Sequence, residues 1–192
     1  MKKFFRLAIA LIVLMSVSFM NVNHIAWAQV EGPGTVPIAP EKITTADGGE
    51  LCVGTACAYF NHKSIPGSGY AGVSVIQQSR IEEFFRMGPP GDTYFVADGI
   101  DVRIYDKNNN QVIYFAPPVK VCFAVRPGWD GVVRYWATAA YLESMGRTML
   151  PGQTGDWIAL PTFIDTVDWP GAYCAWAYEP GAYVAVGGYI GP

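Results

Sequence analysis

The sequence predicts a mostly all-β protein, an antiparallel β-sandwich with one short helix or helical turn near residues 78–87. Three observations predict this class. Short segments alternate apolar and polar residues, as strands with one buried face do. Proline and glycine separate these segments at regular intervals, which is typical of sandwiches built from many short strands. The chain also carries an even number of cysteines, which is typical of exported β-domains held by disulfides.

The N-terminus has the three zones of a secretory signal peptide. Three basic residues fall within the first six positions, and an uncharged apolar run follows at residues 7–20. Ala26-Trp27-Ala28 then supplies the small-x-small pattern of a cleavage site, which predicts Gln29 as the mature N-terminus. The apolar run is well short of the roughly 20 residues that a membrane-spanning helix needs. We therefore expect residues 1–28 to be removed and the protein to be secreted, with no transmembrane segment in the mature chain.

The remaining chain divides into a flexible leader and one domain. Residues 29–40 are rich in glycine and proline and predict no regular structure. Residues 41–192 have the length of a single domain with its own core. All acidic residues but only ten of the thirteen basic ones follow residue 28, so the mature net charge is about −6. This charge disfavours nucleic acid and anionic membranes as partners.

Disulfide bonds are the expected state of the cysteines. Four cysteines allow three connectivities. A metal site is disfavoured, because His62 is the one histidine after residue 28 and would be the sole additional ligand. The four residues are Cys52, Cys57, Cys122 and Cys174.

Hairpin geometry selects one pairing. Residues 51–58 read as two short strands around Gly54–Thr55, and glycine in the first loop position is typical of a type II′ turn. In that register Cys52 faces Cys57 in a non-hydrogen-bonded pair, with Cα atoms about 4.5 Å apart. This distance is at the short end of what a disulfide spans. We therefore predict a Cys52–Cys57 bond, which leaves the other two cysteines for each other.

A second hairpin is expected in the middle of the chain. Ile100–Tyr105 alternates aliphatic and polar residues, Asp106–Asn110 is a polar turn, and Val112–Phe115 is the expected returning strand. The next strand, Val119–Val125, should place alternate residues inward and outward. The expected inward residues are Val119, Val121, Phe123 and Val125, and the outward ones are Lys120, Cys122, Ala124 and Arg126. The second disulfide should then lie on a solvent-facing sheet surface.

Four further segments read as strands, and one reads as a helix. The strands are Val132–Ala137, Trp157–Leu160, Ala172–Tyr178 and Tyr183–Val186. Residues 78–87 instead carry Ile81, Phe84 and Phe85 at helical spacing.

With these segments in place, the chain resembles a bacterial extracellular relative of the β-sandwich domain shared by netrin receptors, ankyrins and zonula-occludens proteins. The similar segments are "VIYFAPPVKVCF" at 112–123, Tyr135-Trp136, "WIALPTFID" at 157–165 and the closing segment at 173–192. The resemblance implies an interaction or scaffolding module and brings no catalytic residues with it. All four cysteines depart from the family pattern.

Catalytic and metal-binding patterns are weak in this sequence. His62 lies in a polar loop with no nucleophile motif beside it, so a hydrolytic triad is disfavoured. Three carboxylate pairs could serve a glycosidase but are more typical of solvated surfaces; they are Asp98/Asp101, Glu82/Glu83 and Asp165/Asp168. The loop that starts at Asp106 has the first three ligand spacings of a calcium loop, with Asn108 and Asn110. It lacks the glycine and the glutamate that such a loop needs, so a turn is the better interpretation.

Aromatic residues are the remaining functional signal. Most should pack in the core or across strands, but some could form an exposed strip that binds sugar or protein. The candidates for such a strip are Trp129, Trp169, Trp176 and Tyr178. We therefore expect a non-catalytic exported module at the cell surface, with no cofactor or metal and with a protein or glycan partner. The alternatives are a carbohydrate-binding module and, third, a hydrolase whose site the sequence does not reveal.

Overall fold

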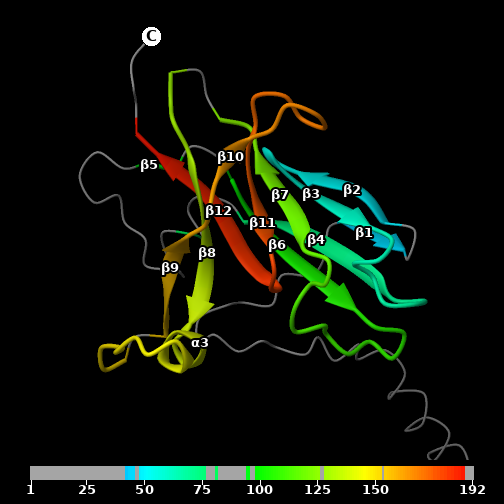
Figure 1. Cartoon of the computed structure of the whole chain (residues 1–192), viewed down its shortest axis with the longest axis horizontal. Helices are drawn as coiled ribbons and strands as arrows, with labels where there is room; N and C mark the ends of the chain where they lie inside the picture. The colour runs from blue at the N-terminus through cyan, green and yellow to red at the C-terminus, as the bar shows by residue number, and fades with distance from the viewer. Residues whose placement is uncertain are drawn as a thin grey trace, which may run out of the picture.

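The protein is a sandwich of two antiparallel β-sheets (Figure 1), which confirms the predicted fold class. The computed structural model describes residues 42–45, 48–76, 81, 94–95, 98–125, 128–152 and 154–188. The expected signal peptide and leader lie outside these residues. So does the expected helix at 78–87, except for Ile81, which is helical and fully buried.

The larger sheet has β6 and β12 at its centre. Its order is β1-β4-β6-β12-β8-β9, and a short β5 pairs with the end of β12. The strands are β1 (Lys42–Thr45), β4 (Tyr70–Ile76), β5 (Tyr94–Phe95), β6 (Gly99–Tyr105), β8 (Val132–Thr138), β9 (Gly155–Ala159) and β12 (Gly181–Gly187).

The smaller sheet has β7 at its centre. Its order is β10-β11-β7-β3-β2, so β7 is hydrogen-bonded to β11 on one side and to β3 on the other. The strands are β2 (Gly48–Val53), β3 (Ala56–Asn61), β7 (Val119–Phe123), β10 (Phe163–Ile164) and β11 (Tyr173–Ala177).

The core lies between the two sheets. Val73 and Val102 come from the larger sheet, Val121 and Phe123 come from β7, and all four are essentially inaccessible to solvent within one apolar cluster. Burial of aliphatic side chains stabilises a fold by about 1.5–3 kcal/mol each. Val119, Val121 and Phe123 of β7 belong to this core cluster, as the alternation predicted.

The turn between β2 and β3 is the predicted type II′ turn. Gly54 has φ +54°, whereas Thr55 is not among the residues with positive φ, which is the type II′ pattern. Thr55 anchors the turn, because its hydroxyl accepts a hydrogen bond from the Asp98 N–H at 2.9 Å and its carbonyl accepts one from the Ala124 N–H at 2.9 Å.

The predicted returning strand at Val112–Phe115 is wrong. The chain after β6 makes one bridge, between Gln111 and Tyr105, and then leaves the sheet. Its neighbour β4 pairs along the whole of β6, and β12 takes the other edge at Ile100–Val102. On the edge of β6 that β12 occupies, only the residues after Val102 are therefore left to pair with the returning chain.

A helix that the sequence analysis did not predict follows β8. α3 spans Ala139–Ser144, and the Thr138 hydroxyl caps it by accepting a hydrogen bond from the Tyr141 N–H at 3.3 Å. Leu142 is its buried residue. No helix among the described residues is long and apolar enough to cross a membrane.

Candidate functional site

The outer face of the smaller sheet carries two rows of side chains that cross the strands. Residues directly opposite each other in antiparallel strands point to the same face. The register therefore aligns one row of Phe163, Cys174, Cys122, Cys57 and Cys52. The adjacent row consists of Trp176, Lys120, Tyr59 and Glu50.

The cysteine row contains both predicted disulfides. Cys52–Cys57 has a Cα–Cα distance of 4.0 Å, and Cys122–Cys174 has one of 4.1 Å. Cys57 and Cys122 also face each other in neighbouring strands. A strand residue directs both its N–H and its C=O to the same neighbouring strand, so it forms a hydrogen-bonded pair on one side and a non-hydrogen-bonded pair on the other. The Cα atoms are farther apart in the first kind of pair than in the second, so wide and close pairs alternate along a row that crosses the strands. The two bonded pairs have the close spacing of non-hydrogen-bonded pairs, which makes Cys57 and Cys122 the wide pair.

The expected solvent exposure of the second disulfide is wrong. Cys122 and Cys174 do point away from the main core, but both are completely buried in a second cluster with Ala172. Tyr59, Phe163 and Trp169 pack against this cluster and cover it. Period-two alternation identifies the face of a sheet and carries no information about what another segment lays over that face.

Asp165 shapes the loop that brings Trp169 over the disulfide. Its backbone N–H donates to the Ala172 carbonyl at 2.8 Å, and its carbonyl accepts from Gly171 at 2.9 Å. Its side chain accepts hydrogen bonds from the backbone N–H groups of Val167 at 3.2 Å and Trp169 at 2.9 Å. The carboxylate thereby fixes the loop between β10 and β11.

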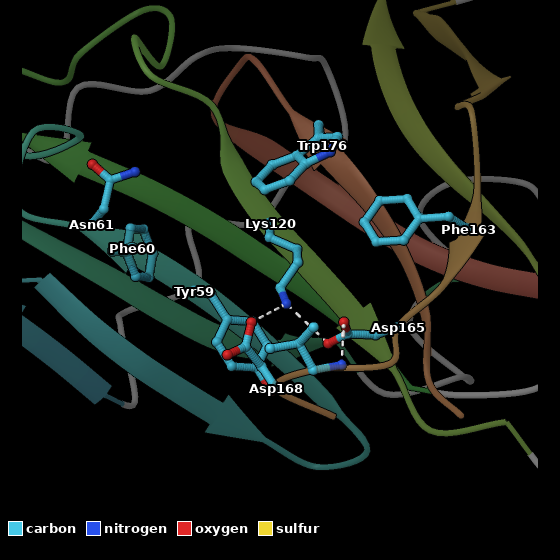
Figure 2. Close-up of a pocket in the computed structure, with 9 residues that line it drawn as sticks. Tyr59, Phe60, Asn61, Lys120, Phe163, Asp165, Asp168 and Trp176 are labelled. Carbon is cyan, nitrogen blue, oxygen red and sulfur yellow. Dashed lines mark hydrogen bonds and ion pairs between the residues drawn. The ribbon is translucent and has the colours of Figure 1, made fainter. Parts of the chain in front are cut away.

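The same carboxylate holds the ammonium group of Lys120 (Figure 2). The Lys120 Nζ donates to Asp165 Oδ2 at 2.9 Å and also to Asp168 Oδ2. It lies 4.5 Å from the centre of the Tyr59 ring, within the range of a cation–π contact. A lysine is seldom buried unless it is paired, and these three partners allow this one to be buried.

The charges of this cluster are fixed at neutral pH. The hydrogen bond from Lys120 lowers the pKa of Asp165 to about 2, although burial opposes this change. Burial alone would lower the pKa of Lys120, but the hydrogen bonds to Asp168 and Asp165 raise it overall. Burial, followed by the nearby charge of Glu50, raises the pKa of Tyr59 to about 12. The Lys120 ammonium and the Asp165 carboxylate are therefore ionised while the Tyr59 phenol is neutral.

A cavity of about 450 Å³ opens beside this cluster. Trp176 and Phe163 provide its aromatic side, with ring centres 6.0 Å apart and planes inclined by 31°. Lys120, Asp165 and Asp168 provide its polar side, as Figure 2 shows. The remaining described residues of the lining are Tyr59, Phe60, Asn61 and Val167. We call this cavity the outer groove.

The structure brings one of the four predicted aromatic residues into the outer groove. Trp176 is 47% exposed and lines it. Tyr178 is exposed two residues further along, as predicted, but it is not among the lining residues. Trp169 is partly buried against the disulfide cluster, and Trp129 is partly buried against the main core.

The other candidate groups lie apart from the outer groove or serve the fold. His62 is exposed in the turn after β3. Asp101 is buried and paired with Arg103 at 2.7 Å, and burial raises its pKa although Arg103 opposes this. Asp98 lies beside the Thr55 turn. The Glu82/Glu83 pair lies outside the described residues.

The loop considered as a calcium site is a turn. The Asp106 carboxylate accepts hydrogen bonds from the backbone N–H groups of Asn108 at 2.8 Å and Asn110 at 2.9 Å. The Asn110 amide also donates to it, at 3.0 Å. These bonds lower the pKa of Asp106 and make its carboxylate part of a local turn.

In the sequence, Asp165 and Asp168 form only one of several carboxylate pairs, and no local pattern connects them to Lys120. No family model matches the chain, and no curated protein matches it. The resemblance to the domain of netrin receptors, ankyrins and zonula-occludens proteins therefore stays a prediction, and the outer groove has to be interpreted from its own geometry.

Proposed function

We propose that this protein is an exported, non-catalytic binding module that acts at the cell surface or in an extracytoplasmic assembly, with the outer groove as its binding surface. One observation carries the proposal. On the outer face of the smaller sheet Tyr59, Phe163 and Trp169 cover the buried disulfide, and beside them lies an open groove. In this groove Trp176 is about half exposed next to the paired charges of Lys120 and Asp165.

The groove has the chemistry of a recognition site. Ligand sites are concave, mostly apolar, and carry a few well-placed polar groups; their usual volume of about 300–1,000 Å³ includes the value found here. Tryptophan is strongly enriched among the residues that dominate binding energies. Trp176 is held by its strand and by the neighbouring Phe163 ring, so little conformational freedom is lost when it contacts a partner.

The charge cluster argues against catalysis. A general acid needs a raised pKa, whereas the Lys120 hydrogen bond lowers that of Asp165 to about 2. Among the described residues of the lining there is no histidine, serine or thiol that could serve as a nucleophile or its base. The ionised carboxylates and ammonium position one another and organise the groove.

Retention on the native cell envelope tests this proposal. The exported protein, its Trp176→Ala variant and its Tyr178→Ala variant are incubated with washed envelope from the host, and the bound fraction is measured. Tyr178 is a matched control, because it is an exposed aromatic residue near Trp176 that does not line the groove. We expect the wild type and Tyr178→Ala to be retained on the envelope. We expect Trp176→Ala to be washed off, although it melts at the same temperature as the wild type. Equal retention of both variants, or no retention of the wild type, contradicts the proposal.

A further inference from the structure

From the chemistry of the outer groove we infer that its ligand is a neutral carbohydrate chain, with a sugar ring packed on Trp176. This inference rests on the proposed binding function and names the class of ligand. It follows from the charge of the groove, from its aromatic surface and from the polar groups at its border.

The charge of the groove disfavours an anionic ligand. Lys120 is the one cation among the described lining residues, and its ammonium is already shared between Asp165 and Asp168. With two acidic side chains and one basic side chain, the cluster has a formal net charge of one negative unit. A phosphate, sulfate or uronate would have to compete with two carboxylates for this ammonium. The cluster therefore repels an anion. A site selective for anions would instead offer a cation that is not already paired.

The same cluster also disfavours a cationic ligand. Aromatic rings with nearby carboxylates can bind ammonium groups, but here Lys120 itself occupies that position. Its Nζ contacts both carboxylates and lies over the Tyr59 ring. A second cation would have to share these partners with a charge that is already bound. A neutral ligand meets neither conflict.

The aromatic surface suits the apolar face of a sugar. The ring hydrogens on one face of a pyranose form an apolar patch, and this patch packs against an aromatic ring. Trp176 is exposed enough to offer such a surface, and Phe163 extends it at a shallow angle of 31°. Aromatic contacts of this kind combine buried area with a directional preference for the ring face.

Polar groups beside this surface match the hydroxyl groups of a sugar. Asp168 is 49% exposed, and its carboxylate has acceptor capacity beyond its bond to Lys120. The Asn61 Oδ1 accepts the backbone N–H groups of Lys63 and Ser64, both at 3.1 Å, which fixes the amide and orients its N–H donors. Hydroxyl groups both donate and accept, so a sugar can bond to the carboxylate and to the amide together.

Calorimetry or affinity electrophoresis with defined polysaccharides tests the inference. The probes are neutral β-glucan, xylan, galactomannan and chitin oligosaccharides, with heparin and polylysine as the anionic and cationic comparisons. We expect the exported protein to bind at least one neutral probe, with an affinity that stays constant between about 0.05 and about 0.5 M salt. Trp176→Ala should weaken this binding by about tenfold or more. Trp176→Phe should lose less, and Tyr178→Ala should bind as the wild type does.

The outcomes separate this inference from the proposed function. If the protein is retained on envelope through Trp176 but binds no neutral probe, the binding function stands and the carbohydrate inference is wrong. Binding to heparin or polylysine that weakens with salt also overturns it, because the recognised group is then charged. If Trp176→Ala has no effect in either experiment, both ideas fail.

Discussion

At the scale of single residues, Gly54 and Gly67 have nearly the same positive φ angle in different surroundings. Their φ angles are +54° and +52°. A Cβ atom on Gly54 would lie 2.8 Å from Asp98 Oδ2 and 3.0 Å from Val75 Cγ2, whereas one on Gly67 would have no neighbour within 4 Å. The pair therefore separates the cost of positive φ from the cost of a steric conflict.

We predict that Gly67→Ala destabilises the protein by about 1 kcal/mol, because its backbone must adopt a left-handed conformation. Gly54→Ala should cost about 2–3 kcal/mol, because Asp98 or Val75 must also move. Urea unfolding of both variants measures the difference. Equal losses would mean that the β2–β3 turn shifts to accommodate the methyl group.

Asp165 predicts a specific sensitivity to acid. Its pKa in the folded state, about 2, lies below the value of about 3.9 expected when unfolded. The ionised group therefore stabilises the fold above about pH 4, and this contribution is lost as the pH falls toward 2. Asp165→Asn should cost about 3 kcal/mol at pH 7, because Lys120 loses a buried partner. The difference from wild type should shrink between pH 5 and pH 2 in denaturant titrations.

Asp156→Asn is the matched control for this titration. Asp156 pairs with Arg147 at 3.2 Å, and both side chains are about half exposed. Such a surface pair contributes less than about 1 kcal/mol. If the two variants lose the same stability at pH 7, the Lys120 cluster does not contribute what its burial implies.

At the scale of elements, the disulfide between β7 and β11 predicts a difference between alanine and serine replacements. The bond closes a separation of 52 residues, so its loss should cost about 4 kcal/mol in the chain-entropy model. Because Cys122 and Cys174 are fully buried, two serine hydroxyls would add a desolvation cost of about 1–3 kcal/mol each. Cys122→Ser with Cys174→Ser should therefore melt below the corresponding alanine double variant.

The bond between β2 and β3 provides the comparison. It closes a separation of five residues and should contribute about 2 kcal/mol. Cys52 is partly exposed, so serine and alanine should differ less there. Thermal unfolding of the four double variants tests both statements. If the double serine variant of Cys122 and Cys174 is as stable as the double alanine variant, the two hydroxyl groups are hydrated. The disulfide would then be in contact with water.

The elements that sequence could predict are those defined by local signals. Glycine in the first position of the 54–55 turn defined the hairpin and its disulfide, because turn type fixes register. The strand at 112–115 failed because β12, some seventy residues later, occupies part of the edge that it needed. α3 was missed because six residues are too short for a helical period to stand out.

At the scale of the whole molecule, the outer groove depends on contacts that are distant in sequence. Lys120 on β7 meets two carboxylates 45 and 48 residues later, and Trp176 joins them from the next strand. The outward direction of Lys120 and Trp176 could be predicted from alternation. Their common groove could not, because it requires the order β10-β11-β7-β3, which no local pattern encodes.

The last prediction concerns export. The disulfides should form only outside the reducing cytosol, so the stability that they give to the domain depends on export. The two closed loops do not overlap, so their contributions of about 4 and about 2 kcal/mol should add. A domain of this size has a net stability of only about 5–15 kcal/mol. A version that starts at Gln29 and stays in a reducing cytosol should therefore lose about 6 kcal/mol of stability and melt far below the oxidised protein.

The chain exported by its own residues 1–28 should instead be fully oxidised and begin at Gln29. Intact mass, thiol counting and thermal unfolding of the two preparations measure these outcomes. Retention of residues 1–28 in the exported protein would refute the predicted signal peptide. A reduced cytosolic protein that melts at the same temperature as the oxidised one would show that the sheets are stable without their disulfides. The four cysteines would then need another explanation.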